Sequence, residues 1–113
     1  MRLPAPHDYP KELLIKDTWW KIEFVSYIKN SKGKKTKDYG ECCNETKIIK
    51  IKKGLNYCDH LYTFCHELVH SFEYEYDFEL TEKQVEKLEH AIANLILCNF
   101  SLFKIMFGAI NKG

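Results

Sequence analysis

The sequence predicts an α+β fold, with strands in the first half of the chain and two helices in the second half. Apolar residues alternate between Glu12 and Lys52, whereas between Asn56 and Phe100 they recur at the three- and four-residue spacing of a helix. Gly, Asn, Ser and Thr residues separate these segments. We therefore expect a small, mainly antiparallel sheet packed on the first helix, with the second helix beside it.

Composition limits the classes of protein to consider. The 113 residues are 45% hydrophobic and 29% charged, with a formal net charge of +1. These values are typical of one soluble domain and favour neither nucleic acid nor a membrane as a partner. The cysteines are odd in number, include no CxxC pair and follow no secretory signal, so we expect free, mostly buried thiols in a cytoplasmic protein. They are Cys42, Cys43, Cys58, Cys65 and Cys98.

Residues 1–18 are predicted to form an N-terminal arm and a first short strand. All three prolines lie within the first ten residues, which favours an extended arm over a helix. Residues 12–15 and 19–29 are predicted strands that form a hairpin about residues 16–18. One face of the second strand carries four apolar side chains, which are Trp20, Ile22, Phe24 and Ile28.

A lysine-rich segment precedes the next pair of strands. Residues 29–37 include five lysines and no apolar residue, so we expect a solvated loop. Residues 39–43 and 46–52 are predicted to form a second hairpin about Asn44 and Glu45, with Ile49 and Ile51 turned to the core. Gly54 ends the second of these strands.

The first helix carries an HExxH motif at residues 66–70. Residues four apart share a helix face, so His66 and His70 can both direct an imidazole at one Zn²⁺ ion. Glu67 stands beside them, where it can act as the general base for a zinc-activated water. Asn56 is a suitable N-cap, and apolar residues support the helix at Leu61, Cys65, Leu68 and Phe72. The motif predicts zinc-dependent hydrolysis of a peptide or amide bond.

The second helix is predicted to run from Thr81 to about Phe100, because Thr81 and Gln84 match a capping box. Glu89 lies about 40° from Val85 on a helical wheel and so shares the inner face of the helix, whereas His90 does not. A buried carboxylate is costly without a partner, and a zinc ion supplies one. The predicted core stripe of this helix is Val85, Leu88, Ile92, Leu95 and Ile96.

The third zinc ligand has three candidates, Glu73, Glu89 and His90. Glu73 lies one turn along the same helix from His70, and we expect it to orient an imidazole instead. His90, at about 140° from Val85, points away from the apolar stripe. We therefore predict Glu89 as the third ligand, with the second helix closing the zinc site.

Residues 101–113 are predicted to form an apolar C-terminal tail that packs on the core or on a homodimer partner. Counted together with the end of the second helix, the apolar run approaches membrane-spanning length. Polar residues interrupt this run, and we therefore expect no membrane anchor. Those residues are Asn94, Asn99, Ser101 and Lys104.

Several short segments together resemble one family. They are Gly40-Glu41-Cys42, Ile49-Lys50-Ile51, the HELVH motif with Ser71-Phe72-Glu73-Tyr74-Glu75-Tyr76 after it, and Leu88-Glu89-His90-Ala91-Ile92 closing at Asn99. The chain resembles the small HExxH domains of phages and bacterial mobile elements, a minimal gluzincin type that is distantly similar to ImmA-like and SprT-like metallopeptidases. The resemblance implies a zincin-like core at residues 19–100, zinc ligands His66, His70 and Glu89, and Glu67 as the base.

Other zinc families match less well. A metzincin needs a third histidine where this chain has Tyr76. Peptide deformylases use a cysteine ligand, and the segment containing Cys42 resembles theirs only faintly. Tyr74 or Tyr76 could hydrogen-bond an oxyanion, although packing is the commoner role of a tyrosine. Three hypotheses stay open: a zinc peptidase acting on a peptide or protein, a zinc-binding interaction protein, and a metal-free look-alike. Glu67 favours the first, since a structural zinc site needs no base.

Overall fold

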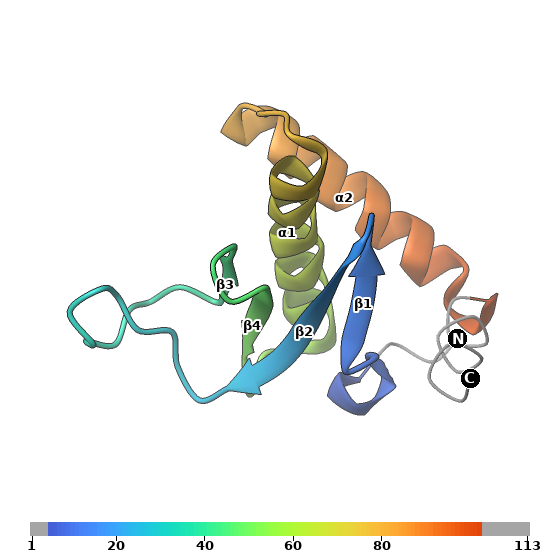
Figure 1. Cartoon of the computed structure of the whole chain (residues 1–113). Coiled ribbons are helices and arrows are strands. Elements are labelled where there is room, and N and C mark those ends of the chain that lie inside the picture. Colours follow the sequence, from blue (N-terminus) through green and yellow to red (C-terminus); the bar gives the residue numbers. More distant parts are fainter. Residues whose placement is uncertain (1–4, 103–113) are drawn as a thin grey trace.

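The structure, a computed structural model, describes residues 5–102 as a four-stranded sheet with two long helices (Figure 1). The α+β fold class predicted from the sequence is confirmed. The elements in chain order are a 3₁₀ helix η1 (Pro6–Asp8), β1 (Glu12–Ile15), β2 (Thr18–Val25), β3 (Gly40–Cys43), β4 (Ile48–Lys52), α1 (Tyr57–Tyr76) and α2 (Glu82–Cys98).

The sheet is mixed: two of its three strand pairings are antiparallel, in line with the expected mainly antiparallel sheet, and the third is parallel. Its strand order is β1-β2-β4-β3. Both predicted hairpins are present, because β1 pairs with β2 and β3 pairs with β4 in antiparallel register. However, β2 and β4 run parallel, with Ile22 opposite Ile49 and Phe24 opposite Ile51. The long connection between β2 and β3 makes this pairing possible, since parallel neighbours need a crossover rather than a tight turn.

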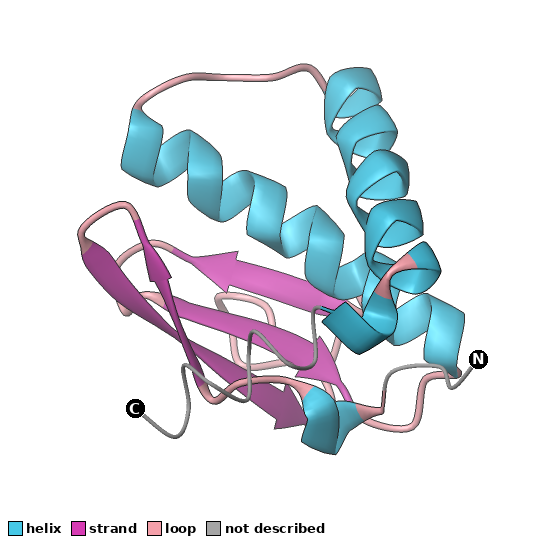
Figure 2. Ribbon diagram, turned by 90° about the vertical axis from the view of Figure 1, so that its right-hand side faces the viewer, coloured by secondary structure: helices cyan, strands magenta, loops and turns pink. Residues whose placement is uncertain are grey.

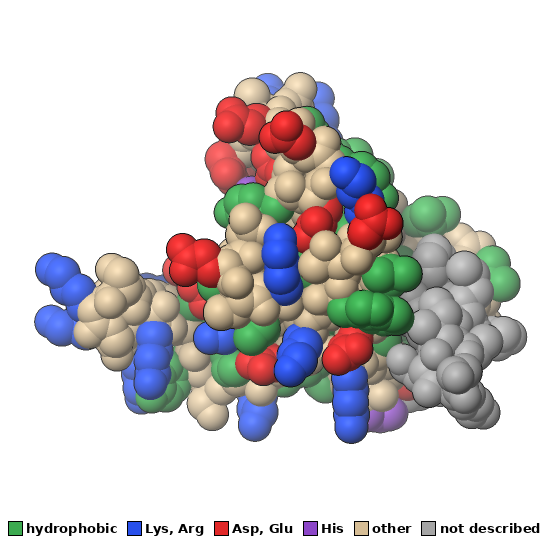
Figure 3. Space-filling view, viewed as in Figure 1, with side chains coloured by type: hydrophobic (Ala, Val, Ile, Leu, Met, Phe, Trp, Pro, Cys, Tyr) green, Lys and Arg blue, Asp and Glu red, His purple; other side chains and the backbone are tan. Residues whose placement is uncertain are grey.

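That connection extends away from the body of the molecule (Figure 1). An isolated bridge between Lys29 and Lys35 closes its tip. Lysine side chains gather on this projection in the space-filling view (Figure 3), as expected for a solvated loop. The projection ends at β3, which is an edge strand because it is last in the strand order of the sheet.

The core lies between one face of the sheet and the helices (Figure 2). Trp20, Ile49 and Ile51 are fully buried from the sheet side. Leu61 and Cys65 of α1 belong to the same buried cluster. The alternation along β2 and β4 therefore places the predicted apolar face inward, at Trp20 and Ile22 in β2 and at Ile49 and Ile51 in β4.

Local capping fixes the ends of both helices. The Asn56 side chain accepts a hydrogen bond from the Asp59 backbone N–H at 2.8 Å, and α1 ends at Asp77, which has a left-handed backbone with φ of 54°. Thr81 and Gln84 form the predicted reciprocal capping box at the start of α2. These predicted helix boundaries are confirmed to within two residues.

The buried face of α2 differs from the predicted one. Val85 and Ala93 are fully buried and Ile96 is nearly so, whereas Leu88 is 42% exposed and Leu95 is 56% exposed. The prediction that Leu88 and Leu95 belong to the core stripe is therefore wrong. The helix turns a small residue, Ala93, inward, and a small side chain permits close approach to a neighbouring element.

Side-chain hydrogen bonds tie the end of α1 to the sheet. The Glu75 carboxylate accepts from Trp20 Nε1 at 2.8 Å, from Thr18 Oγ1 at 3.2 Å and from Lys47 Nζ at 2.9 Å. The Lys47 ammonium also lies 5.1 Å from the centroid of the Trp20 ring. These contacts fix the direction in which α1 leaves the sheet.

The N-terminal arm and the thiols show two smaller differences from expectation. The arm includes a 3₁₀ turn, and Tyr9 Oη lies 2.8 Å from Nδ1 of the buried His60. Each of the five cysteines is free, but Cys65 alone is buried, and Cys58 and Cys98 are exposed. In the described part of the chain no helix is long and apolar enough to cross a membrane. The tail prediction for residues 103–113 lies outside the described residues.

Candidate metal centre

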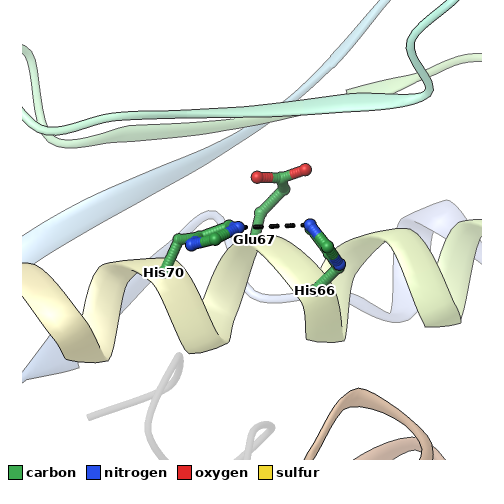
Figure 4. A group of neighbouring side chains, drawn as sticks. All are labelled: His66, Glu67 and His70. Atoms are coloured by element: carbon green, nitrogen blue, oxygen red, sulfur yellow. Dashed lines mark hydrogen bonds between the residues drawn. The ribbon is translucent and has the colours of Figure 1, made fainter. Parts of the chain in front are cut away.

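The motif side chains lie together on α1. Nε2 of His66 and Nε2 of His70 face each other at 3.2 Å, and the Glu67 side chain rises between the two rings (Figure 4). The candidate ligand atoms of these three residues all lie within 4.8 Å of one another. The helical spacing of four residues therefore brings together the atoms that the sequence predicts.

A carboxylate holds the outer nitrogen of each imidazole. Glu89 Oε1 lies 2.8 Å from Nδ1 of His66, so a residue of α2 orients a histidine of α1. Glu73 Oε1 lies 2.7 Å from Nδ1 of His70, which confirms the predicted orienting contact of Glu73. The second oxygen of Glu73 accepts from the Leu80 backbone N–H at 2.9 Å, and so His70 is also linked to the loop between the helices.

These contacts determine which nitrogens are available to a metal. When each neutral ring donates its Nδ1 proton to a carboxylate, both Nε2 atoms present lone pairs to each other. Two lone pairs facing at 3.2 Å repel unless a cation or a proton lies near both. Two nitrogen ligands of a tetrahedral zinc ion lie roughly 3.3 Å apart, given Zn–N bonds of about 2.0–2.1 Å. The donor set and its spacing therefore fit a zinc ion.

Glu67 is the buried carboxylate of the site. Burial raises the pKa of Glu67, the imidazoles of His66 and His70 lower it in part, and the nearby acidic residues Glu41 and Asp38 raise it further. A carboxylate whose pKa is raised above its usual range can both accept and return a proton near neutral pH. The position of Glu67 beside the facing Nε2 atoms suits it to this role.

Strand β3 lies directly against the motif helix at Gly40. A Cβ at this position would lie 2.5 Å from Thr63 Cγ2 and 3.1 Å from both Glu67 Oε2 and the Lys50 carbonyl oxygen. Glycine therefore lets the edge strand pass close to Glu67. Cys42, two residues along, is half-buried on the same strand, and burial raises its pKa to about 12, so its thiol stays protonated near neutral pH.

Two hollows flank the centre. One, of about 530 Å³, reaches His66, Glu67 and Glu89 and is walled by residues 37–40 of the projecting connection and by the start of α1. The other, also of about 530 Å³, reaches His70 and Glu73 and is walled by the loop between the helices. The two imidazoles thus stand between two open recesses.

The residues predicted for the site have three different outcomes in position. His66, Glu67 and His70 come together as expected. Glu89 reaches the site, but it contacts the outer nitrogen of His66, and its direct ligation of zinc stays a prediction. His90 is 61% exposed and lies against the ring of Tyr62, and its Nε2 is 3.9 Å from Glu89 Oε2.

Sequence reasoning missed the walls of the hollows. Tyr62 and Thr63 were not singled out, although both precede His66 by about one helical turn and line the first hollow. Their spacing from the motif was the available signal. Of the two tyrosines considered for an oxyanion, Tyr74 lines the second hollow, whereas the Lys16 ammonium lies over the ring of Tyr76, 5.7 Å from the ring centroid.

Comparison with family models, with curated proteins and with solved structures found no match.

Proposed function

We propose that this protein is a zinc-dependent hydrolase of the peptidase type, with His66 and His70 as zinc ligands and Glu67 as the general base. The observation that carries the proposal is the pair of Nε2 atoms facing at 3.2 Å, each on a ring whose outer nitrogen is held by a carboxylate. This arrangement suits a nitrogen-binding cation such as zinc. The sequence resemblance to small gluzincins supports the same assignment.

In the proposed reaction, the protein supplies orientation and proton transfer. Bound zinc would lower the pKa of a water molecule and polarise the carbonyl of the bond to be cleaved. Glu67 would accept the proton of that water and pass it to the leaving amine, which its raised pKa favours. Glu73 and Glu89 would hold the imidazoles in the tautomer that leaves Nε2 free.

The surroundings suit an extended substrate. A peptide crossing the centre would place residues in the hollow beside His66 on one side and in the hollow beside His70 on the other. α1 packs against β3 and against α2, and in the proposed site α2 would close the zinc centre. In this reading Glu89 is the residue through which α2 acts on the centre.

The decisive experiment compares zinc content and hydrolysis for Glu67→Gln. We expect the wild type to bind one zinc ion per chain and to cleave members of a mixed peptide library. Glu67→Gln should retain the zinc and the melting temperature, because this residue is assigned as the base, while hydrolysis falls by about two to four orders of magnitude. Glu86→Gln, an exposed change on α2 at a residue that lines neither hollow, is the matched control and should retain activity.

Two other outcomes would reject the peptidase assignment. A wild-type protein without bound zinc, after purification in zinc-containing buffer, would contradict the metal centre itself. A zinc-loaded protein whose biological effect is undiminished in Glu67→Gln would identify a zinc-binding interaction protein, the alternative that the sequence leaves open.

A further inference from the structure

The outer face of α2 carries an apolar stripe that the core does not use. On α2, Leu88 and Leu95 are 42% and 56% exposed, and Ala91 and Cys98 are also exposed. Leu102, which follows the end of α2 at Cys98, is 57% exposed. We name these five residues the outer stripe. The inner face of the same helix is buried through Val85, Ala93 and Ile96. α2 therefore has two apolar faces, and within residues 5–102 only the inner one is buried.

The spacing of the outer stripe is that of a helix–helix seam. Its four members on α2 follow one another at intervals of three, four and three residues, which is the a/d spacing of a coiled coil. A stripe of this kind matches a second helix with the same repeat.

The charge pattern favours a second copy of this chain as the partner helix. The chain carries no charged residue from Ala91 to Phe103. Two copies can therefore bring the same face together without like-charge repulsion, as a two-fold symmetric contact requires. A charged partner would find no complementary group on this segment. In Figure 3, hydrophobic side chains reach the surface on the side of the molecule where α2 ends.

We infer that the outer stripe of α2 is a homodimer interface in which α2 packs against α2 of a second copy. The interface is independent of the metal centre, because the centre uses Glu89 on the inner face of the helix. The loss of either property would therefore leave the other in place.

The test is the mass of the full chain in solution, measured by light scattering over about two orders of magnitude in concentration. We expect twice the chain mass of 13.4 kDa at the upper end. Leu95→Glu places a charge in the middle of the stripe and should raise the dimer dissociation constant by about a hundredfold or more. Because the Leu95 side chain is exposed in the single chain, the helix content of the Leu95→Glu variant should equal that of the wild type.

Leu14→Glu is the matched control. Leu14 is 54% exposed on β1, nearly the same as the 56% of Leu95, but lies outside the outer stripe, so this variant should remain dimeric. Leu102→Glu, placed after α2 ends, gives a second test should Leu95→Glu lower helix content. Zinc content is measured in parallel and should be equal in all variants.

Three results would overturn the inference. The first is a wild type that remains a single chain at every concentration. The second is equal dissociation by Leu14→Glu and Leu95→Glu, since the stripe would then have no special role. The third is a monomeric full chain that dimerises only after removal of residues 103–113, which would show that the chain's own end covers the stripe.

Discussion

The two motif histidines differ in what holds them. His66 is held by Glu89 from another helix, whereas His70 is held by Glu73 from its own helix. A carboxylate on the outer nitrogen of a ligand histidine fixes its orientation and raises the basicity of the inner nitrogen. The two imidazoles therefore depend on different parts of the fold, and variants of the two carboxylates should have different consequences.

Glu89 can be tested with two substitutions that separate orientation from ligation. In Glu89→Gln the amide oxygen can still accept from Nδ1 of His66, so we expect zinc affinity to fall only slightly. Glu89→Ala removes the contact and should weaken zinc binding by about 10- to 100-fold, the usual effect of losing an orienting partner. The measurement is competitive titration against a zinc-binding dye.

The control for this pair is His90→Ala. His90 is 61% exposed, and its Nε2 lies 3.9 Å from Glu89 Oε2, whereas Glu89 contacts His66 through Oε1. The zinc affinity of this variant should therefore equal that of the wild type. If Glu89→Gln and Glu89→Ala lost zinc equally, Glu89 would instead be the direct ligand predicted from the sequence. Loss of zinc in His90→Ala would contradict both roles of Glu89.

Among the contacts between elements, the one between β3 and α1 leaves the least room for added volume near the site. The edge strand passes the motif helix where Gly40 faces Thr63 and Glu67. Packed interiors tolerate little added volume, because neighbours must leave favourable rotamers to make room. The position of the Glu67 carboxylate should therefore be sensitive to a single added methyl group on β3.

Gly40→Ala should destabilise the protein by about 1–3 kcal/mol, the usual range for overpacking, and should lower hydrolysis because the new Cβ also lies near Glu67 Oε2. Urea unfolding and peptide cleavage provide the measurements. Adding Thr63→Ser removes the Cγ2 methyl group nearest to the new Cβ, and the double variant should recover part of the lost stability. No recovery would show that the clash with the backbone carbonyl of Lys50 dominates.

Helix boundaries were predictable from the sequence because their causes are local. Asn56, Thr81 and Gln84 cap the helices through residues within one turn. The inner face of α2 was only partly predictable, since a stripe chosen by size selects Leu88 and Leu95, whereas the fold buries Ala93. Which of two apolar faces turns inward depends on the fit against other elements, and no local pattern specifies it.

At the scale of the whole molecule, the parallel pairing of β2 and β4 was the least predictable feature. Residues 21–25 pair with residues 48–52 across the projecting connection and β3, and hairpin signals report only on neighbours in sequence. The motif, in contrast, was visible because both histidines lie within one stretch of helix. The contact between the Glu89 carboxylate and Nδ1 of His66 depends on how α2 approaches α1, so the sequence did not predict it.

The last prediction concerns the coupling of zinc binding to the stability of the fold. The groups that hold the centre come from α1, from α2 and from the loop between them, so the centre is complete only in the folded chain. A ligand that binds only the folded state stabilises it by about 2.7 kcal/mol at a hundred times its dissociation constant. For a domain of this size, that corresponds to a rise in melting temperature on the order of 10 °C. Differential scanning calorimetry with and without zinc measures this shift, and a chelator should reverse the shift.

Mg²⁺ should give no shift in melting temperature, because imidazole nitrogen is a poor ligand for Mg²⁺. The double variant His66→Ala with His70→Ala should melt at the same temperature with or without zinc, and an undiminished shift in that variant would place the zinc elsewhere in the chain.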